Sequence, residues 1–160
     1  MIALGVDPGT ETSGYGLVRV EGPRAWFIAC GEVVSTLAAF RALIRQHTPD
    51  VAGVEGVAIM RLAAAKQLLE TQRISTTARC AAEAEGVALM VANSDVWRRA
   101  LGVPHKRSGS TTDAKVEAML RMRLAGMPGP GKTNSHKRDG LGVALWAGLG
   151  FRGRTEVVSV

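Results

Sequence analysis

Three acidic residues and one histidine have the types and spacing that could hold a metal ion. Asp7 and Glu55 each close a short apolar run, IALGVD and DVAGVE, where a carboxylate gains nothing from a hydrophobic core. Asp139 falls in the first turn of an expected helix, and His136 precedes it by three residues, so both side chains share one helix face. Three carboxylates and one imidazole suit a hard divalent cation, Mg²⁺ or Mn²⁺, and the imidazole favours Mn²⁺ slightly.

Two of these acids also have a simpler structural interpretation. Asp7 could hydrogen-bond within the turn at Pro8-Gly9, which is a common use of aspartate. Asp139 could be a helix N-terminal acid that the helix dipole favours. Glu55, with glycines on both sides, is the hardest to explain in such terms. Because carboxylates crowded without a cation repel one another and raise their own pKa values, the set is best explained by bound metal.

Basic residues are concentrated in residues 97–138. Ten lysines and arginines stand there against two acids, so the segment carries +8 and leaves −2 for the rest of a chain whose net charge is +6. Such a concentration is expected of a protein that binds a polyanion, although it could also be a solubilising face. No amphipathic basic helix with an aromatic face accompanies it, which favours nucleic acid over an anionic membrane. The residues expected to contact DNA are Arg98, Arg99, Lys106, Arg107, Lys115 and Lys132.

The elements that must position these residues form an α/β pattern. Runs of β-formers predict strands over 2–7, 15–20, 25–34, 50–55 and 87–93, with a hairpin turn at 21–24. Apolar residues at helical spacing predict helices from Leu37 to Thr48, over 63–84, from a Ser94 cap to 101, from about 113 to 124, and from about 135 to 149. A three-strand meander followed by alternating helices and strands predicts a mixed five-stranded sheet with helices against it.

Length and composition predict one domain over residues 1–160. Within it we expect a mobile basic loop at 103–112, a Gly/Pro linker at 126–134 and a tail at 151–160. Cys30 and Cys80 lack metal-ligand spacing, which predicts two free, buried thiols in a reducing compartment. The sequence contains neither a signal-peptide pattern nor an apolar run long enough to span a membrane. These features predict a cytoplasmic protein.

Three segments resemble the RuvC-type Holliday junction resolvases, members of the RNase H-like nuclease superfamily. GVDPGTETSGYGLV (5–18) resembles the opening strand–turn–strand of that family, VEGVAIM (54–60) its second acidic motif, and SHKRDGLGVALWA (135–147) its C-terminal helix. The order and approximate spacing hold from residue 2 to about 149. The resemblance implies an RNase H-like mixed five-stranded sheet, an antiparallel meander plus parallel strands, with helices on both faces.

The resemblance also assigns site residues. It places the four metal ligands at Asp7, Glu55, His136 and Asp139, around two Mg²⁺ or Mn²⁺ ions per site. Most members have an acid where this chain has His136, so whether the imidazole ligates metal or activates water stays open. Lys115 matches one lysine of the family, whereas Arg98 or Arg99 matches a second only approximately. Typical members insert an aromatic wedge into the junction shortly after the second acid; residues 57–60 of this chain are aliphatic or Met, so the wedge is either aliphatic or absent here.

The activity that the resemblance implies is resolution of four-way DNA junctions. Members act as homodimers that nick two symmetry-related strands and leave 5′-phosphate ends, and a branch-migration motor is a further expected partner. The implied location is the cytoplasm of a bacterium, or of an infected bacterial host. Two other functions stay open: a catalytically lapsed junction-binding scaffold, for which the histidine at 136 is the only support, and a nuclease for other branched or hybrid nucleic acids.

Two nucleotide-binding interpretations fail on context. GMPGPGKT (126–133) matches the phosphate-loop spacing, but it follows an amphipathic helix instead of a strand and contains two prolines. VDPGTETSGYG resembles the phosphate-binding hairpin of actin-like and sugar-kinase ATPases, which need two such domains. The chain is too short for two, and it contains no second copy of the hairpin. We therefore expect no nucleotide as a ligand.

Overall fold

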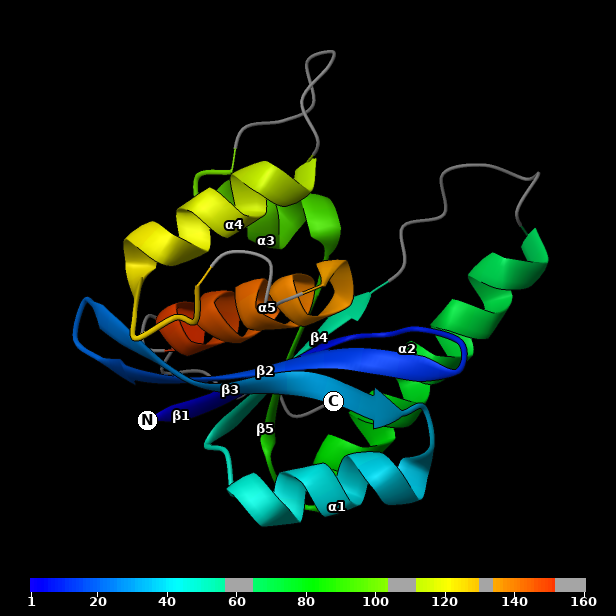
Figure 1. The fold of residues 1–160 in the computed structure, drawn as a ribbon. Coiled ribbons are helices and arrows are strands. Elements are labelled where there is room, and N and C mark those ends of the chain that lie inside the picture. Colours follow the sequence, from blue (N-terminus) through cyan, green and yellow to red (C-terminus); the bar gives the residue numbers. More distant parts are fainter. Residues whose placement is uncertain (57–64, 104–111, 130–133, 152–160) are drawn as a thin grey trace.

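The computed structural model describes residues 1–56, 65–103, 112–129 and 134–151, and its centre is a six-stranded sheet (Figure 1). The strands are β1 (Ile2–Asp7), β2 (Thr12–Glu21), β3 (Arg24–Val34), β4 (Val51–Gly56), β5 (Ala88–Asn93) and β6 (Leu124–Ala125), in the order β5-β4-β1-β2-β3-β6. β1, β2 and β3 form an antiparallel meander, and β4 and β5 continue the sheet in parallel from β1. The predicted mixed sheet of antiparallel and parallel strands is confirmed.

The sixth strand is an addition to the five that periodicity predicts. β6 is two residues long and pairs in parallel with β3, Leu124 opposite Ala25 and Ala125 opposite Trp26. The next residue, Gly126, has a φ of +79°, a left-handed conformation that glycine adopts at little cost and that turns the chain away. Two residues are too few to produce a period-2 pattern, so this strand has no signature in the sequence.

Helices cover both faces of the sheet. They are α1 (Leu37–His47), α2 (Ala65–Ala84), α3 (Ser94–Ala100), α4 (Thr112–Arg123) and α5 (Ser135–Phe151). Figure 1 shows α1 and α2 on one side of the sheet and α5, with α3 and α4 beyond it, on the other. Helices on both faces are what the family resemblance implies.

Each face of the sheet has its own hydrophobic core. On the α1 and α2 side, Leu4 and Leu17 of the sheet pack with Phe40 and Ile74 of the helices, all fully buried. On the α5 side, the core contains sheet residues such as Val18 together with residues of α3, α4 and α5. Because alternate residues of a strand face opposite sides, one sheet supplies both cores, and burial on two faces explains the continuous apolar runs.

Local signals set most of the boundaries, with one correction. The 21–24 turn forms with Gly22 at φ +59°, and α1 starts at Leu37 after the Thr36 cap. α3, however, is capped by Asn93, whose side-chain oxygen accepts from Val96 N at 3.0 Å, so the expected Ser94 cap is wrong by one residue. Asparagine and serine cap helices about equally well, so propensity alone could not choose between these neighbours.

Several expectations concern residues outside the described ones. These are 57–60 after the second acid, 104–111 of the basic loop, 130–133 of the linker and 152–160 of the tail. Both cysteines are free, but Cys30 is only half-buried and Cys80 is exposed on α2, so the expectation of buried thiols is wrong. Among the described residues, no helix combines the length and the hydropathy needed to cross a membrane.

Candidate active site

Asp7 and Glu55 lie side by side at one edge of the sheet. β1 and β4 are hydrogen-bonded parallel neighbours, with Val6 opposite Val54, so the next residue of each strand is the acid. Parallel strands present their carboxyl ends at the same edge, where a sheet commonly forms its sites. The two strands that end in acids are therefore neighbours in the sheet.

The turn after Asp7 is held by buried serines. Ser13 Oγ accepts from Gly9 N at 3.3 Å, Ser35 Oγ donates to Gly9 O at 2.6 Å, and the two hydroxyl oxygens lie 2.8 Å apart. Both serines are buried, at 0% and 8% exposure. Serines thus supply hydrogen bonds to this turn, and the Asp7 carboxylate is directed to His136 instead (Oδ2–Nδ1 2.7 Å). The interpretation of Asp7 as a turn residue alone is therefore not supported.

α5 reaches the acids because glycines let it lie directly on β1 and β2. A Cβ on Gly5 would come within 2.1 Å of Gly140 O, and one on Gly14 within 2.2 Å of His136 O. A Cβ on Gly140 would in turn meet the Tyr15 backbone at 2.8 Å. Helix and sheet therefore touch backbone to backbone, which sequence periodicity did not reveal. The glycines of GVDPGTETSGYG and RDGLG were the available signal.

The first turn of α5 is tied to the far strand of the meander as well. Asn134 Oδ1 accepts from Lys137 N at 3.0 Å and so caps the helix, while the Asn134 amide nitrogen donates to the Glu32 carboxylate of β3. Glu32 is paired with Gly14, which is paired with Asp7, so the three residues lie in one row across the sheet. This row fixes where α5 begins relative to Asp7.

His136 is held by a carboxylate. Its Nδ1 lies 2.7 Å from Asp7 Oδ2, and about half of its side chain is exposed. The hydrogen bond that His136 donates to Asp7 is the largest cause that raises the pKa of His136; burial opposes it, and the charges of Asp7, Asp139 and Glu32 reinforce it. With Nδ1 engaged, Nε2 is the ring nitrogen that remains for a ligand or a proton.

Among the site acids whose pKa is shifted, Glu55 has the larger shift. Burial, which disfavours a charged carboxylate, is the main reason that its pKa is raised to about 8. The Asp7 and Asp139 charges raise it further, while the hydrogen bond from Trp97 and the Arg98 charge lower it. Trp97 Nε1 donates to Glu55 Oε2 at 2.9 Å, a contact that sequence reasoning missed.

Asp139 is paired with an arginine of α3. Arg98 donates to Asp139 Oδ2 at 2.7 Å, and the two side chains are 22% and 16% exposed. Burial is the largest cause that raises the pKa of Asp139 to about 6; the Arg98 charge lowers it, and the Asp7 charge raises it. Arg98 was expected to contact a DNA phosphate, but in this structure its guanidinium is paired with Asp139.

The side chains of the site fit a hard divalent cation by their chemistry. Asp7 and His136 are in contact, the charges of all three carboxylates interact, and their mutual repulsion contributes to the raised pKa values of Glu55 and Asp139. Within the described residues, no group of three or more His, Cys, Asp or Glu side chains is already arranged around a metal position. The structure brings the four predicted ligands together, and each of them has a protein partner. A metal would have to replace some of these partners.

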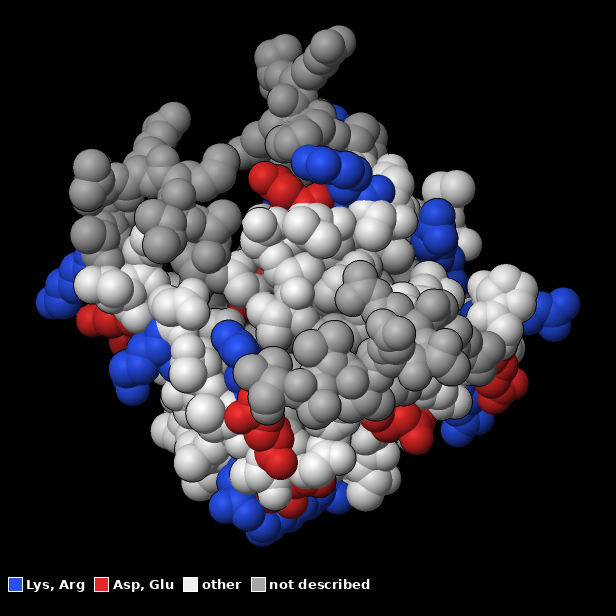
Figure 2. Space-filling model, turned by 180° about the vertical axis from the view of Figure 1, so that it is seen from behind, with Lys and Arg blue, Asp and Glu red and all other residues white. Residues whose placement is uncertain are grey.

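The other predicted DNA contacts have mixed positions. Arg99 is exposed on α3 and Lys115 is half-buried on α4, whereas Lys106, Arg107 and Lys132 lie outside the described residues. Further arginines of the basic segment are paired with acids: Arg121 with Glu117, and Arg138 with Asp113 and Glu117. On the face shown in Figure 2, Lys and Arg side chains are spread around the rim, several of them beside acids. The +8 of the segment is therefore not all available to a polyanion.

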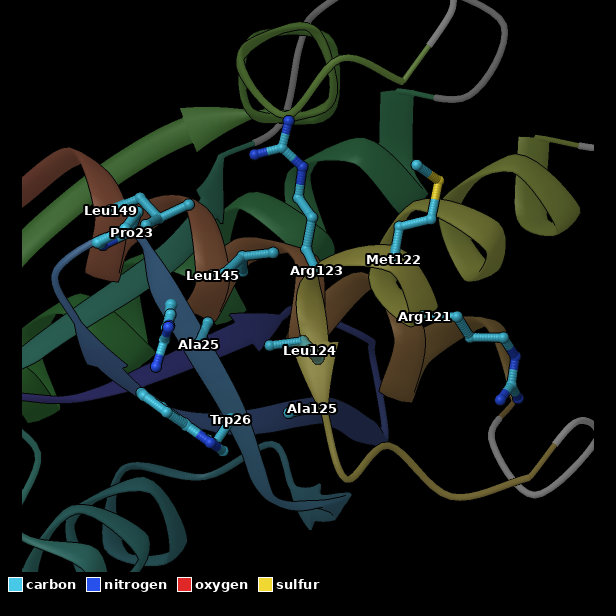
Figure 3. A pocket seen from close by; sticks show the side chains of 11 residues that line it. Pro23, Ala25, Trp26, Arg121, Met122, Arg123, Leu124, Ala125, Leu145 and Leu149 are labelled. Atoms are coloured by element: carbon cyan, nitrogen blue, oxygen red, sulfur yellow. The ribbon is translucent and has the colours of Figure 1, made fainter.

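A pocket of about 510 Å³ lies at the opposite end of α5. Figure 3 shows it lined by Leu145 and Leu149 of α5, by Leu124 of β6 and by residues of the β2–β3 hairpin. None of the four candidate ligands lines it. The acids therefore belong to the strand-end edge of the sheet and not to this pocket.

Comparisons with known proteins place the chain in a family. No protein-family model matches it. It is 30% identical over 160 residues to crossover junction endodeoxyribonuclease RuvC of Erythrobacter litoralis, with 90% of each protein covered. It is 31% identical to the RuvC of Maricaulis maris, over 89% of this chain and 87% of that protein. Its fold matches the structure of T. thermophilus RuvC in complex with Holliday junction substrate, with a TM-score of 0.72, 21% identity and coverage of 97% and 98%.

The sheet and the acidic edge define the class of protein. A mixed sheet with helices on both faces, acids at the ends of adjacent parallel strands and a helix crossing them is the RNase H-like arrangement. With the sequence identities above, the chain belongs to the RuvC family of crossover junction endodeoxyribonucleases.

Proposed function

We propose that this protein is a metal-dependent endonuclease that resolves four-way DNA junctions by paired, symmetric nicks leaving 5′-phosphate ends. The observation that carries the proposal is the meeting of Asp7 and Glu55, from neighbouring parallel strands, with His136 and Asp139 of α5. The family membership supports the activity, and the structural match to a junction-bound resolvase supports the substrate.

The four residues would hold two Mg²⁺ or Mn²⁺ ions. When bound, ions of this kind lower the pKa of a water and stabilise the charge that develops on the attacking and leaving oxygens of a phosphodiester. The carboxylates supply the hard oxygen ligands that these ions prefer. Asp7 is central to the set, because its charge acts on Glu55, His136 and Asp139 alike.

His136 supplies a proton-carrying group beside the acids. The Asp7 carboxylate fixes the ring through Nδ1 and favours its charged form. Nε2 is then the atom that can ligate metal or hold the proton of a reacting water. The replacement of the usual acid at this position by histidine removes one negative charge from the site and so lowers its repulsion for DNA phosphate.

Junction binding would combine two features of the chain. The basic segment 97–138 neutralises phosphates, so affinity should fall as salt concentration rises. Recognition would rest on junction shape rather than on base edges. Two symmetric nicks require two sites, so we propose a homodimer on the junction, and a branch-migration motor as a further partner.

Metal-dependent cleavage is the direct test. A labelled four-way junction, a plain duplex and an RNA–DNA hybrid are incubated with the protein and Mg²⁺, Mn²⁺ or EDTA. We expect paired nicks in the junction with either metal, products that DNA ligase can reseal, and no cutting in EDTA. Mass photometry of the same mixtures should show a dimer on the junction.

Two results would replace this proposal by a different function. Binding of the junction without cleavage in either metal would identify a scaffold, which the Asp139–Arg98 pair and the absence of a preformed metal position among the described residues would then explain. Preferential cutting of the hybrid would keep the chemistry and change the substrate.

A further inference from the structure

α3 brings two consecutive side chains to two different acids of the site. Trp97 Nε1 donates to Glu55 Oε2 at 2.9 Å, and Arg98 donates to Asp139 Oδ2 at 2.7 Å. The Arg98 guanidinium also lies 4.9 Å from the centre of the Trp97 ring, within the range of a cation–π contact. One short helix therefore contacts the acidic edge at two points.

Trp97 is fixed in place by its surroundings. It is fully buried, and a Cβ on Gly142 of α5 would come within 2.5 Å of its ring, so only glycine leaves room for the indole there. The indole nitrogen can donate but not accept, so it favours the ionised form of Glu55 and fixes one of its oxygens. This contact is suited to keep Glu55 aimed into the site.

The Arg98–Asp139 pair is built differently. A single guanidinium nitrogen reaches a single carboxylate oxygen, and Arg98 Nε is buried without a hydrogen-bond partner among the residues that the structure describes. A guanidinium satisfies a carboxylate best with two parallel N–H bonds. Arg98 therefore neutralises Asp139 without the geometry of an optimised structural pair, which makes the contact exchangeable.

We propose that Arg98 is a positioning residue that occupies the cation's place beside Asp139 until metal binds. This inference rests on the metal site of the proposed function. Metal and Arg98 compete for one carboxylate, so binding of the ion requires Arg98 to release Asp139. Trp97 keeps Glu55 oriented throughout, and the released guanidinium becomes available to a DNA phosphate.

Metal binding without DNA tests the competition. Mn²⁺ is titrated into the protein, and free Mn²⁺ is measured by electron paramagnetic resonance. We expect Arg98→Gln to bind Mn²⁺ about tenfold more tightly than the unchanged protein, because a nearby positive charge and a competitor for Asp139 are both removed. Arg99→Gln is the matched control, since it removes the same charge from the neighbouring exposed position, and it should leave the affinity unchanged.

Cleavage then separates positioning from structure. Arg98→Gln should raise the KM for the junction although it binds metal more tightly. A variant that only loosened the fold would bind both the junction and the metal more weakly. Mn²⁺ affinity equal in Arg98→Gln and Arg99→Gln would overturn the inference and leave the proposed function intact. Failure of the unchanged protein to bind Mn²⁺ at all would instead overturn the proposed function.

A measurement on the unchanged protein covers the case in which Arg98→Gln does not fold. The Nε–H signals of the arginines are followed by ¹⁵N NMR while Mg²⁺ is added, with Arg98→Lys used to assign the signal. The Arg98 signal should shift on saturation, and the Arg99 signal should not. An Arg98 signal unmoved by saturating Mg²⁺ would mean that the ion pair survives metal binding, which contradicts the inference.

Discussion

Two groups of carboxylates in this molecule have opposite surroundings. Glu85 and Glu117 are each contacted by two arginines, and their pKa values are lowered. Asp7, Glu55 and Asp139 share one arginine and one histidine, and the pKa values of Glu55 and Asp139 are raised to about 8 and about 6. The first group has enough positive charge to be stable without a ligand, and the second does not.

The paired acids owe their partners to local spacing and simple packing. Arg41 and Arg45 are one helical turn apart on α1, and their Nε atoms reach the two oxygens of Glu85 at 2.5 and 2.8 Å. Arg121 reaches Glu117 within α4 at i,i+4. Such pairs are structural and individually weak.

The site acids come from three separate elements that gather at one edge. Burial raises the pKa of Glu55 and of Asp139 first, and mutual repulsion adds to it. A fold gains no stability from such an arrangement, so it is best explained by a cation that binds there. The comparison thus separates acids that stabilise the fold from acids that are kept for a ligand.

The largest effect is expected from Asp7→Asn, which removes the charge that acts on every other group of the site. Junction cleavage should fall about 10³-fold, because a ligand and the partner of His136 are lost together. Junction binding should persist or become tighter, since repulsion toward phosphate decreases. Cleavage rates and gel-shift affinities measure the two effects. Glu83→Gln, an exposed acid of α2, is the control and should change neither; full activity of Asp7→Asn would refute the role of Asp7.

His136 stands where most of the family has an acid, so substitutions there change the charge of the site directly. His136→Asp should retain cleavage within about tenfold, since it restores an oxygen ligand, whereas His136→Ala should lose about 10- to 100-fold. Metal titrations of the rate show whether the loss can be overcome with more Mn²⁺. An alanine variant as active as the unchanged protein would show that cleavage does not require the imidazole.

The stability of the metal-free protein should depend on pH through Glu55. Its folded pKa of about 8 lies above its ordinary value of 4.5, so its contribution to stability is fully present below pH 4.5 and is lost as the pH rises through 8. The loss is at most about 4 to 5 kcal/mol. Urea unfolding in EDTA between pH 5 and 9 measures it.

Two comparisons check that this pH dependence comes from the site. Glu55→Gln should remove most of the decline, because the amide does not ionise, and Mn²⁺ should restore stability at high pH by binding the ionised acids. Metal affinity should itself increase from pH 6 to 8 as Asp139 and Glu55 lose their protons. A free energy of unfolding that does not change with pH in the unchanged protein would show that neighbouring positive charges neutralise the site acids in the folded state.

The smallest effect is expected at the paired acids. Glu85→Gln should lower the melting temperature by no more than a few degrees and leave cleavage unchanged, because ion pairs whose arginines are 37% and 62% exposed contribute little. The lowered pKa of Glu85, caused mainly by the Arg45 hydrogen bond, gives a contribution present above its unfolded pKa and lost on acidification. High salt should reduce the difference between the variants. A loss of cleavage would contradict the distinction between the two groups.

Sequence reasoning reached the site acids more easily than the residues that hold them. Asp7 and Glu55 were visible because a carboxylate at the end of an apolar strand breaks the pattern, and His136 and Asp139 because their spacing places them on one face of an expected helix. Trp97 was hidden, because an apolar ring on a short helix is indistinguishable from core until its nitrogen is seen to bind Glu55. Arg98 was assigned to DNA from its charge, and the structure pairs it with Asp139 instead.

Periodicity by itself determined the helices, the five longer strands and the order in which they follow one another, because each depends on neighbours in the chain. The sequence also determined that two strands end in acids and that basic residues are concentrated in 97–138. Only the tertiary structure decided which charges meet. The backbone contacts at Gly5 and Gly14 bring α5 onto β1 and β2, and α3 then places one arginine among three carboxylates. These contacts join residues far apart in the sequence. The pKa values of Glu55 and Asp139 depend first on burial, which no local sequence pattern specifies.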